Sequence, residues 1–191
     1  GYDFFNRMYY AQANKQALIF DERSNGGGQA ADYITDVLSP FHLAGWLSRG
    51  DQLPYNTQFG AHYGPKVMMI DQDAGSGGDF LPYSFRRREI GPLIGTRTWG
   101  GLIGISTNPG LVDGGSLVVP YFRFYTPDGE WRVENEGVAP DIEIHLDPVA
   151  TNAGRDNQLE RALAELERMM AAQTTPSVPL TAPAAPETVG Q

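Results

Sequence analysis

The chain has 191 residues, of which 41% are hydrophobic and 11% aromatic, and its formal net charge is −9 at pH 7. This length allows one domain with a full hydrophobic core rather than two. The acidic balance argues against nucleic acid as a partner, and no apolar run approaches the roughly 20 residues that a membrane helix needs. The absence of cysteine excludes disulfides, thiolate metal sites and a cysteine nucleophile.

The first part of the chain has the pattern of a β-loop-α unit. Helical spacing of apolar residues predicts a helix within residues 2–13, and the short apolar run 17–20 predicts a buried strand. The strand leads into a charged loop with three successive glycines, residues 21–28, and then into a helix over 30–38. Functional sites gather at the carboxyl ends of strands in such units, and consecutive glycines leave backbone N–H groups open to an anion or an oxyanion.

A second unit of this kind is centred on Ser76. The apolar run 66–70 predicts a buried strand, and Gly75 and Gly77 flank the serine just beyond it. Glycines on both sides permit a tight turn that exposes the hydroxyl, with the N–H of Gly77 free to face an oxyanion. The alternative is a flexible Gly-Ser turn. Because Pro82 fits best in a first helical turn, we expect the following helix to begin only near Ser84.

The remaining elements are predicted from shorter patterns. A third β-like run starts at 93–95, a hairpin joins strands on either side of a turn at 126–129, and a short strand covers 142–146. Residues 157–170 predict an amphipathic helix capped by Asp156 or Asn157. We therefore expect one domain over residues 1–172. Residues 173–191, which are rich in Pro, Ala and Thr, predict a disordered tail.

Four blocks of sequence resemble one family in order and spacing. Residues 21–28 read DERSNGGG and resemble the Asp-x-Arg-x-Asn-x-Gly-Gly loop of the S41 serine peptidases, the tail-specific and tricorn-type proteases. Residues 74–79 (AGSGGD) stand where that family has its nucleophile. Residues 94–101 (IGTRTWGG) resemble its Gly-x-[Lys/Arg]-Thr-[Trp/Phe]-Gly block, and 134–141 (ENEGVAPD) its Gly-Val-x-Pro-Asp segment. The resemblance covers about residues 1–146.

The residue at position 97 separates the branches of the family. Tail-specific proteases use a lysine base there, whereas an arginine keeps its proton at any ordinary pH, so Arg97 excludes a Ser-Lys dyad. The tricorn branch also has arginine, and it takes its histidine from an upstream subdomain. By resemblance, Ser76 is the nucleophile, Gly77 and Gly27 supply the oxyanion-hole amides, and Glu134 is the supporting glutamate. Gly26 and Glu136 are the alternatives to Gly27 and Glu134.

None of the three histidines, His42, His62 and His145, falls in a motif of the family, and their scatter argues against a metal site. We expect no cofactor. The resemblance implies an α/β domain of the crotonase and ClpP kind, a fragment of a longer chain that hydrolyses peptides through an acyl-enzyme. It also implies an upstream catalytic subdomain of the same protein as partner, a homo-oligomer and a cytoplasmic location, with export not excluded.

Two other classes of function remain open from the sequence. The first is a non-catalytic peptide-binding module that keeps the oxyanion loop but has lost the chemistry. The second is an acyl-CoA enzyme of the same fold, which would need a basic patch for the nucleotide. Only Arg86, Arg87 and Arg88 offer such a patch.

Overall fold

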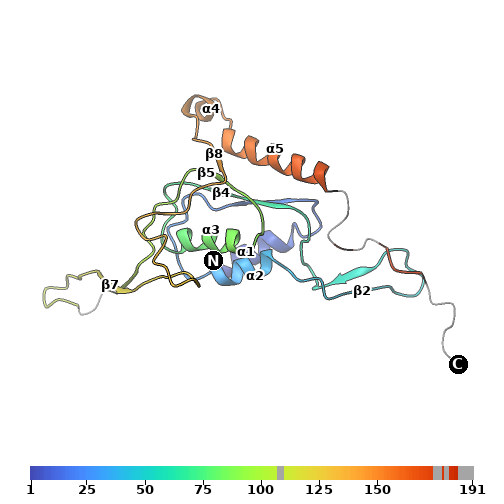
Figure 1. The fold of residues 1–191 in the computed structure, drawn as a ribbon, viewed down its shortest axis with the longest axis horizontal. Helices are drawn as coiled ribbons and strands as arrows, with labels where there is room; N and C mark the ends of the chain where they lie inside the picture. Colours follow the sequence, from blue (N-terminus) through green and yellow to red (C-terminus); the bar gives the residue numbers. More distant parts are fainter. Residues whose placement is uncertain (107–109, 174–177, 179–180, 185–191) are drawn as a thin grey trace.

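A four-stranded parallel sheet forms the centre of the molecule (Figure 1). The structure is a computed structural model and describes all residues except 107–109, 174–177, 179–180 and 185–191. The strands lie in the order β1 (Leu18–Asp21), β4 (Lys66–Ile70), β5 (Leu93–Gly95) and β8 (Ile142–Glu143), and each neighbouring pair is parallel. The predicted α/β class, with strands joined through loops to helices, is confirmed.

Helices cover both faces of this sheet. On one face lie α1 (Tyr2–Tyr10), α2 (Ala31–Leu38) and α3 (Gly77–Arg87), and on the other lies α5 (Asn157–Ala172), as Figure 1 shows. The short helix α4 (Pro148–Asn152) connects β8 to α5. Strand β4 packs against the helices on both faces, because successive side chains of a strand point to opposite faces of the sheet. Met68 and Ile70 belong to the cluster with α1, α2 and α3, while Val67 and Met69 pack with Ala162 and Leu166 of α5 and its neighbours.

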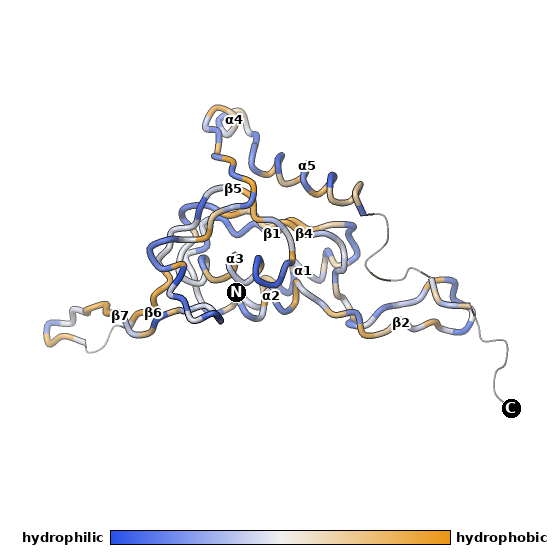
Figure 2. Tube along the Cα trace, viewed as in Figure 1, coloured by the Kyte–Doolittle hydropathy of each residue, from blue (hydrophilic) through white to orange (hydrophobic). Residues whose placement is uncertain are grey.

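Two antiparallel hairpins project from the body, as the tube in Figure 2 shows. One pairs β2 (Ala44–Trp46) with β3 (Tyr55–Thr57), and the other pairs β6 (Gly104–Ser106) with β7 (Val119–Phe122). The turn at 126–129 exists, but the hairpin predicted around it is wrong. Strand β7 pairs with the earlier strand β6, and the backbone after the turn bends sharply instead, with positive φ angles at Val133 and Asn135.

Helix α3 also begins earlier than predicted, at Gly77 rather than near Ser84. Pro82 therefore lies in the second turn, where a proline costs about 3 kcal/mol. The same stretch buries Leu81 and Phe85 against the sheet, and each fully buried large side chain contributes about 1.5–3 kcal/mol. Burial thus offsets the cost of the proline.

Helix α5 begins after its predicted cap, Asp156, which accepts a hydrogen bond from the N–H of Leu159. It ends at Ala172, where the predicted domain ends. Most of the predicted tail, residues 173–191, lies outside the described residues.

Candidate active site

Ser76 occupies a strained turn between the end of β4 and the start of α3. Its φ of 57° and ψ of −117° are rare for a residue with a side chain. Such strain persists only where the surroundings determine it, and it is typical of nucleophiles presented at a strand-to-helix turn. Asp71, directly after β4, fixes the approach to the turn. Its Oδ1 accepts hydrogen bonds from the N–H groups of Asp73 and Ala74.

The glycine loop that follows β1 runs directly against this turn. A Cβ on Gly27, whose φ is 113°, would lie 2.7 Å from Cβ and 3.0 Å from Oγ of Ser76. A Cβ on Gly77 would lie 2.2 Å from the carbonyl oxygen and 2.8 Å from the nitrogen of Gly28. Real side chains do not approach so closely, so positions 27 and 77 require glycine. The backbone of residues 27–28 therefore lies beside the serine, as the resemblance implies.

Three backbone amides near Ser76 differ in what they bind. Among the described residues, the N–H groups of Gly77 and Gly28 donate to no protein acceptor. The N–H of Gly27 donates to Oδ1 of Asn25 at 2.9 Å. Gly77 stands at the first position of α3, where the helix dipole places partial positive charge and the N–H has no partner within the helix. Gly77 and Gly28 are thus open to an anionic oxygen.

Asp79 fixes the Ser76 turn through its side chain, a role that the sequence motifs did not predict. Its side chain is completely buried and accepts four hydrogen bonds. Oδ1 accepts from Oγ1 of Thr98 at 2.5 Å and from the N–H of Gly100 at 2.8 Å, and Oδ2 accepts from the N–H groups of Ser76 at 2.9 Å and Gly101 at 3.0 Å. One buried carboxylate therefore fixes the nucleophile turn against the loop that follows β5.

Glu134 lies against the same loop from the other side. Its Oε2 accepts hydrogen bonds from the N–H groups of Leu102 at 2.7 Å and Ile103 at 2.6 Å. The carbonyl of Gly101, just before them, accepts from the N–H of Ser76 at 3.0 Å. The alternative glutamate, Glu136, instead pairs with Arg132 at 3.4 Å. Glu134 is therefore the glutamate that contacts the loop beside the serine.

Arg97 and Trp99 belong to this loop too. Arg97 is exposed and donates through Nη1 to the carbonyl of Glu136 at 3.1 Å. The indole of Trp99 covers the backbone of Gly75 and Gly101, where added Cβ atoms would meet it at 2.5 Å and 2.3 Å. Trp99 is nonetheless 69% exposed. A flat aromatic surface thus lies open on the two backbone segments that flank Ser76.

A buried acid lies at the base of the glycine loop. Glu22, directly after β1, is 3% exposed, and its Oε1 accepts a hydrogen bond from Nδ2 of Asn25 at 2.6 Å. Burial raises the pKa of the Glu22 carboxyl to about 8. The hydrogen bond from Asn25 opposes this shift, and the carboxylates of Asp21 and Asp71 add to it. Glu22 is therefore predominantly neutral at pH 7.

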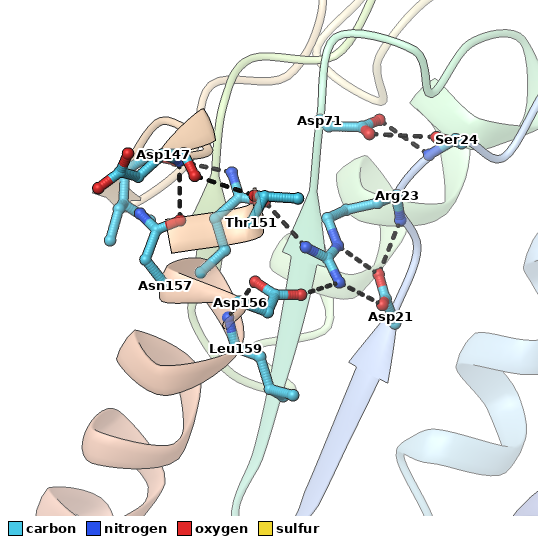
Figure 3. A network of polar contacts seen from close by, with 11 residues as sticks. Asp21, Arg23, Ser24, Asp71, Asp147, Thr151, Asp156, Asn157 and Leu159 are labelled. Atoms are coloured by element: carbon cyan, nitrogen blue, oxygen red, sulfur yellow. Dashed lines mark hydrogen bonds and ion pairs between the residues drawn. The ribbon is translucent and has the colours of Figure 1, made fainter. Parts of the chain in front are cut away.

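The two residues between Glu22 and Asn25 anchor the loop to other elements (Figure 3). Arg23 pairs through Nη2 with Oδ2 of Asp21 at 2.7 Å and with Oδ2 of Asp156, the cap of α5, at 2.8 Å. Ser24 donates its N–H to Oδ1 of Asp71 at 2.8 Å. The glycine loop is thus joined both to the last helix and to the segment that leads into the serine turn.

The three histidines have partners away from Ser76. His42 contacts Oδ1 of Asn56, His62 contacts the carbonyl of Lys15, and His145 pairs with Glu143. Burial lowers the pKa of His62 to about 4. Within the described residues, no histidine forms a hydrogen bond with the serine, and no cluster of three His, Cys, Asp or Glu side chains could hold a metal ion. The same residues include no helix long and apolar enough to cross a membrane.

The strained serine, the open amides and the glycine loop lie together at one edge of the sheet, and the chain belongs to peptidase family S41. The model of that family matches residues 2–144.

The chain's relatives include tricorn proteases. It is 40% identical over 174 residues to the Tricorn protease of Thermoplasma volcanium, which covers 88% of this chain and 17% of that protein. It is 36% identical over 184 residues to Tricorn protease homolog 1 of Streptomyces coelicolor, a match that covers 94% of this chain and 17% of that protein. The crystal structure of the tricorn protease matches with a TM-score of 0.81 and 34% identity, covering 88% of this chain and 16% of that one. The chain therefore spans only a small part of the length of these relatives.

Proposed function

We propose that this chain carries the nucleophile and the oxyanion hole of a serine peptidase that cleaves peptides through an acyl-enzyme. The observation that carries the proposal is the backbone of Ser76, held at φ 57° beside a Gly77 amide that has no acceptor among the described residues. A flexible Gly-Ser turn would need neither this strain nor the buried Asp79 that maintains it. Membership in peptidase family S41 and the similarity to tricorn proteases support the same function.

In the proposed reaction, Oγ of Ser76 attacks the carbonyl carbon of the peptide while a base takes the hydroxyl proton. The C–N bond then breaks, and the proton passes to the leaving amine. Water attacks the resulting ester, and the serine regains its proton. Negative charge on the carbonyl oxygen develops twice, and amide donors fixed in place stabilise it without reorganisation.

We propose Gly77 as the first oxyanion donor and the glycine loop as the source of the second. Gly27 lies closest to Ser76, but its N–H serves the oxyanion only if it releases Asn25. Gly28 has a free N–H in the structure described here, and it is the donor available without rearrangement.

The base is proposed to come from an upstream subdomain of the same protein, because the described histidines are engaged elsewhere. Glu134 has one carboxyl oxygen, Oε1, without a hydrogen-bond partner among the described residues. That oxygen is available to orient an incoming group, which supports its proposed role as the glutamate that aligns the base. We also propose that identical copies assemble, since both hairpins expose apolar side chains, among them Trp46 and Tyr121. A cytoplasmic location stays a prediction.

The proposal is tested with Ser76→Ala in the longer protein that contains this chain. We expect kcat/KM to fall by at least about 10³-fold while the melting temperature changes little, because the hydroxyl carries the covalent step. Ser48→Ala, in an exposed segment, is the matched control and should leave both unchanged. A fluorophosphonate should label the wild type at Ser76 by mass spectrometry. Activity of Ser76→Ala within tenfold of wild type would remove this residue from the mechanism.

A further inference from the structure

Asn25 connects the buried acid Glu22 to the backbone around the nucleophile. Its Nδ2 donates to Oε1 of Glu22 at 2.6 Å, and its Oδ1 accepts from the N–H of Gly27 at 2.9 Å. Its own carbonyl accepts from the N–H of Gly75, directly before Ser76, at 2.9 Å. One asparagine thus binds both sides of the site, the glycine loop and the serine turn.

We propose that Glu22 is a positioning residue, which acts through Asn25 to hold the glycine loop in register with Ser76. This inference rests on the proposed peptidase function and concerns the same site. Glu22 does not touch the reacting atoms. Its effect is to decide whether the loop amides stand where the oxyanion would form.

The orientation of the Asn25 amide shows how the connection works. A side-chain amide has one donor end and one acceptor end, so it can hold Gly27 through Oδ1 only if Nδ2 faces an acceptor. Glu22 supplies that acceptor from a buried position. If the amide turned over, Nδ2 would face the N–H of Gly27, and two donors would oppose each other. The N–H of Gly27 and the acceptor oxygen of Glu22 together therefore fix the orientation of Asn25 that retains the loop.

The charges around Glu22 make this connection dependent on pH. Asp21 and Asp71 are the charged groups that act on Glu22, and both are acidic. Arg23, the adjacent cation, is already paired with Asp21 and Asp156. When Glu22 loses its proton, a buried negative charge lies near two others without its own cation. Exposure of Glu22 to water lowers the free-energy cost of that charge. Water can reach Glu22 only if the glycine loop moves away.

The sign of the effect follows from the two pKa values. The pKa of Glu22 is about 8 in the folded chain and 4.5 when unperturbed. The folded chain therefore holds a proton that the unfolded chain releases between these values, and stability falls as pH rises through this interval. The ordered loop is therefore held most firmly when Glu22 is protonated, and in the folded chain this form is lost with a midpoint near pH 8. Glu22→Gln keeps the acceptor and has no proton to lose, so it should remove the dependence.

The first test uses ¹H–¹⁵N spectra of the 191-residue chain between pH 6 and 9.5. We expect the amide signals of Gly27 and Gly75 to shift with a midpoint near pH 8 in wild type and to stay in place in Glu22→Gln. Glu160→Gln, on the exposed surface of α5, is the matched control and should titrate as wild type does. If Gly27 does not titrate, or titrates equally in Glu22→Gln, the connection is refuted. This readout needs no peptidase activity, so it is independent of the proposed function.

The second test measures kcat/KM of the longer protein over the same pH range. If only the protonated form is active, wild type should lose about 30-fold between pH 7 and 9.5, whereas Glu22→Gln should lose less than about threefold. Asn25→Ala should have a low kcat/KM at every pH, because it lacks the side chain that connects Glu22 to Gly27. It serves as the second variant if Glu22→Gln folds poorly. An equal loss of kcat/KM at alkaline pH in wild type and Glu22→Gln would overturn the positioning role. Persistence of activity in Ser76→Ala would instead refute the proposed function.

Discussion

Asp79→Asn offers the most demanding test of how the nucleophile turn is maintained. The wild-type carboxylate accepts four hydrogen bonds, from Ser76, Thr98, Gly100 and Gly101, and no part of it is exposed. Asparagine keeps one oxygen and replaces the other with an NH₂ group. In either orientation one backbone N–H, that of Gly100 or of Gly101, then loses its acceptor and faces a donor, and the remaining bonds lose their charged acceptor. An unsatisfied buried group costs about 1–3 kcal/mol and the weaker remaining bonds add to it, so the expected loss of stability is about 2–4 kcal/mol.

This loss should lower the melting temperature by about 10 °C in a chain of this size. Chemical denaturation at pH 7 gives the free energy of unfolding directly. Asp73→Asn is the matched control, because Asp73 is exposed and, in the described part of the chain, its side chain accepts a single hydrogen bond, from Gln72. Fluorophosphonate labelling of the longer protein should slow as well, since Ser76 loses the group that fixes its backbone. A stability within about 0.5 kcal/mol of wild type would refute the view that Asp79 maintains the turn.

Two further predictions concern the loop beside the serine. Gly27→Ala should reduce kcat/KM of the longer protein by at least about 100-fold and also lower stability, because the added Cβ would collide with Ser76 and the φ of 113° is strained for alanine. Gly26→Ala is the control: a Cβ there would meet no atom within 4 Å, so this substitution should be nearly neutral. Similar effects of the two substitutions would contradict the observed approach. Arg23→Ala should cost about 1–3 kcal/mol of stability and speed hydrogen exchange at the start of α5, because the bonds to Asp21, Asp156 and Gln158 are lost. Arg155→Ala removes an exposed ion pair and should have little effect on either, so an equal response would argue against the anchoring role of Arg23.

The elements that sequence predicted well are those whose pattern reflects burial. Residues 67–70 form an uninterrupted apolar run because β4 is buried on both faces, and the structure has the strand at the predicted bounds, 66–70. The Ser76 turn was recognisable from its flanking glycines. The start of α3 was not, because the local penalty of Pro82 hides the burial of Leu81 and Phe85, which depends on distant parts of the chain.

The supporting residues of the site were harder to find. Ser76 and Asp79 have the spacing of a capping box, a serine followed three positions later by an acid, and this signal could have revealed Asp79. Nothing local marks its contacts with Thr98 and Gly100, which arise only when the loop after β5 folds back. In the sequence, Glu22 is one of several charged residues in a polar loop, and nothing in its neighbours indicates that it is buried. Its burial follows from the packing of β1 beside β4, which no single stretch of sequence records.

The walls around Ser76 are made largely of main chain, and this affects which substitutions the candidate site can tolerate. At Gly27 and Gly77 the absence of a side chain permits the close approach, so any substitution there must displace the backbone beside Ser76. Trp99 is different, because its indole only rests on the surface of the site and is open to solvent. For the proposed peptidase, we therefore expect variation at Trp99 to alter which peptides are accepted while the backbone around Ser76 stays intact. A library of variants should accordingly separate into a few intolerant glycines and a permissive rim, and new substrate preferences should arise from the rim.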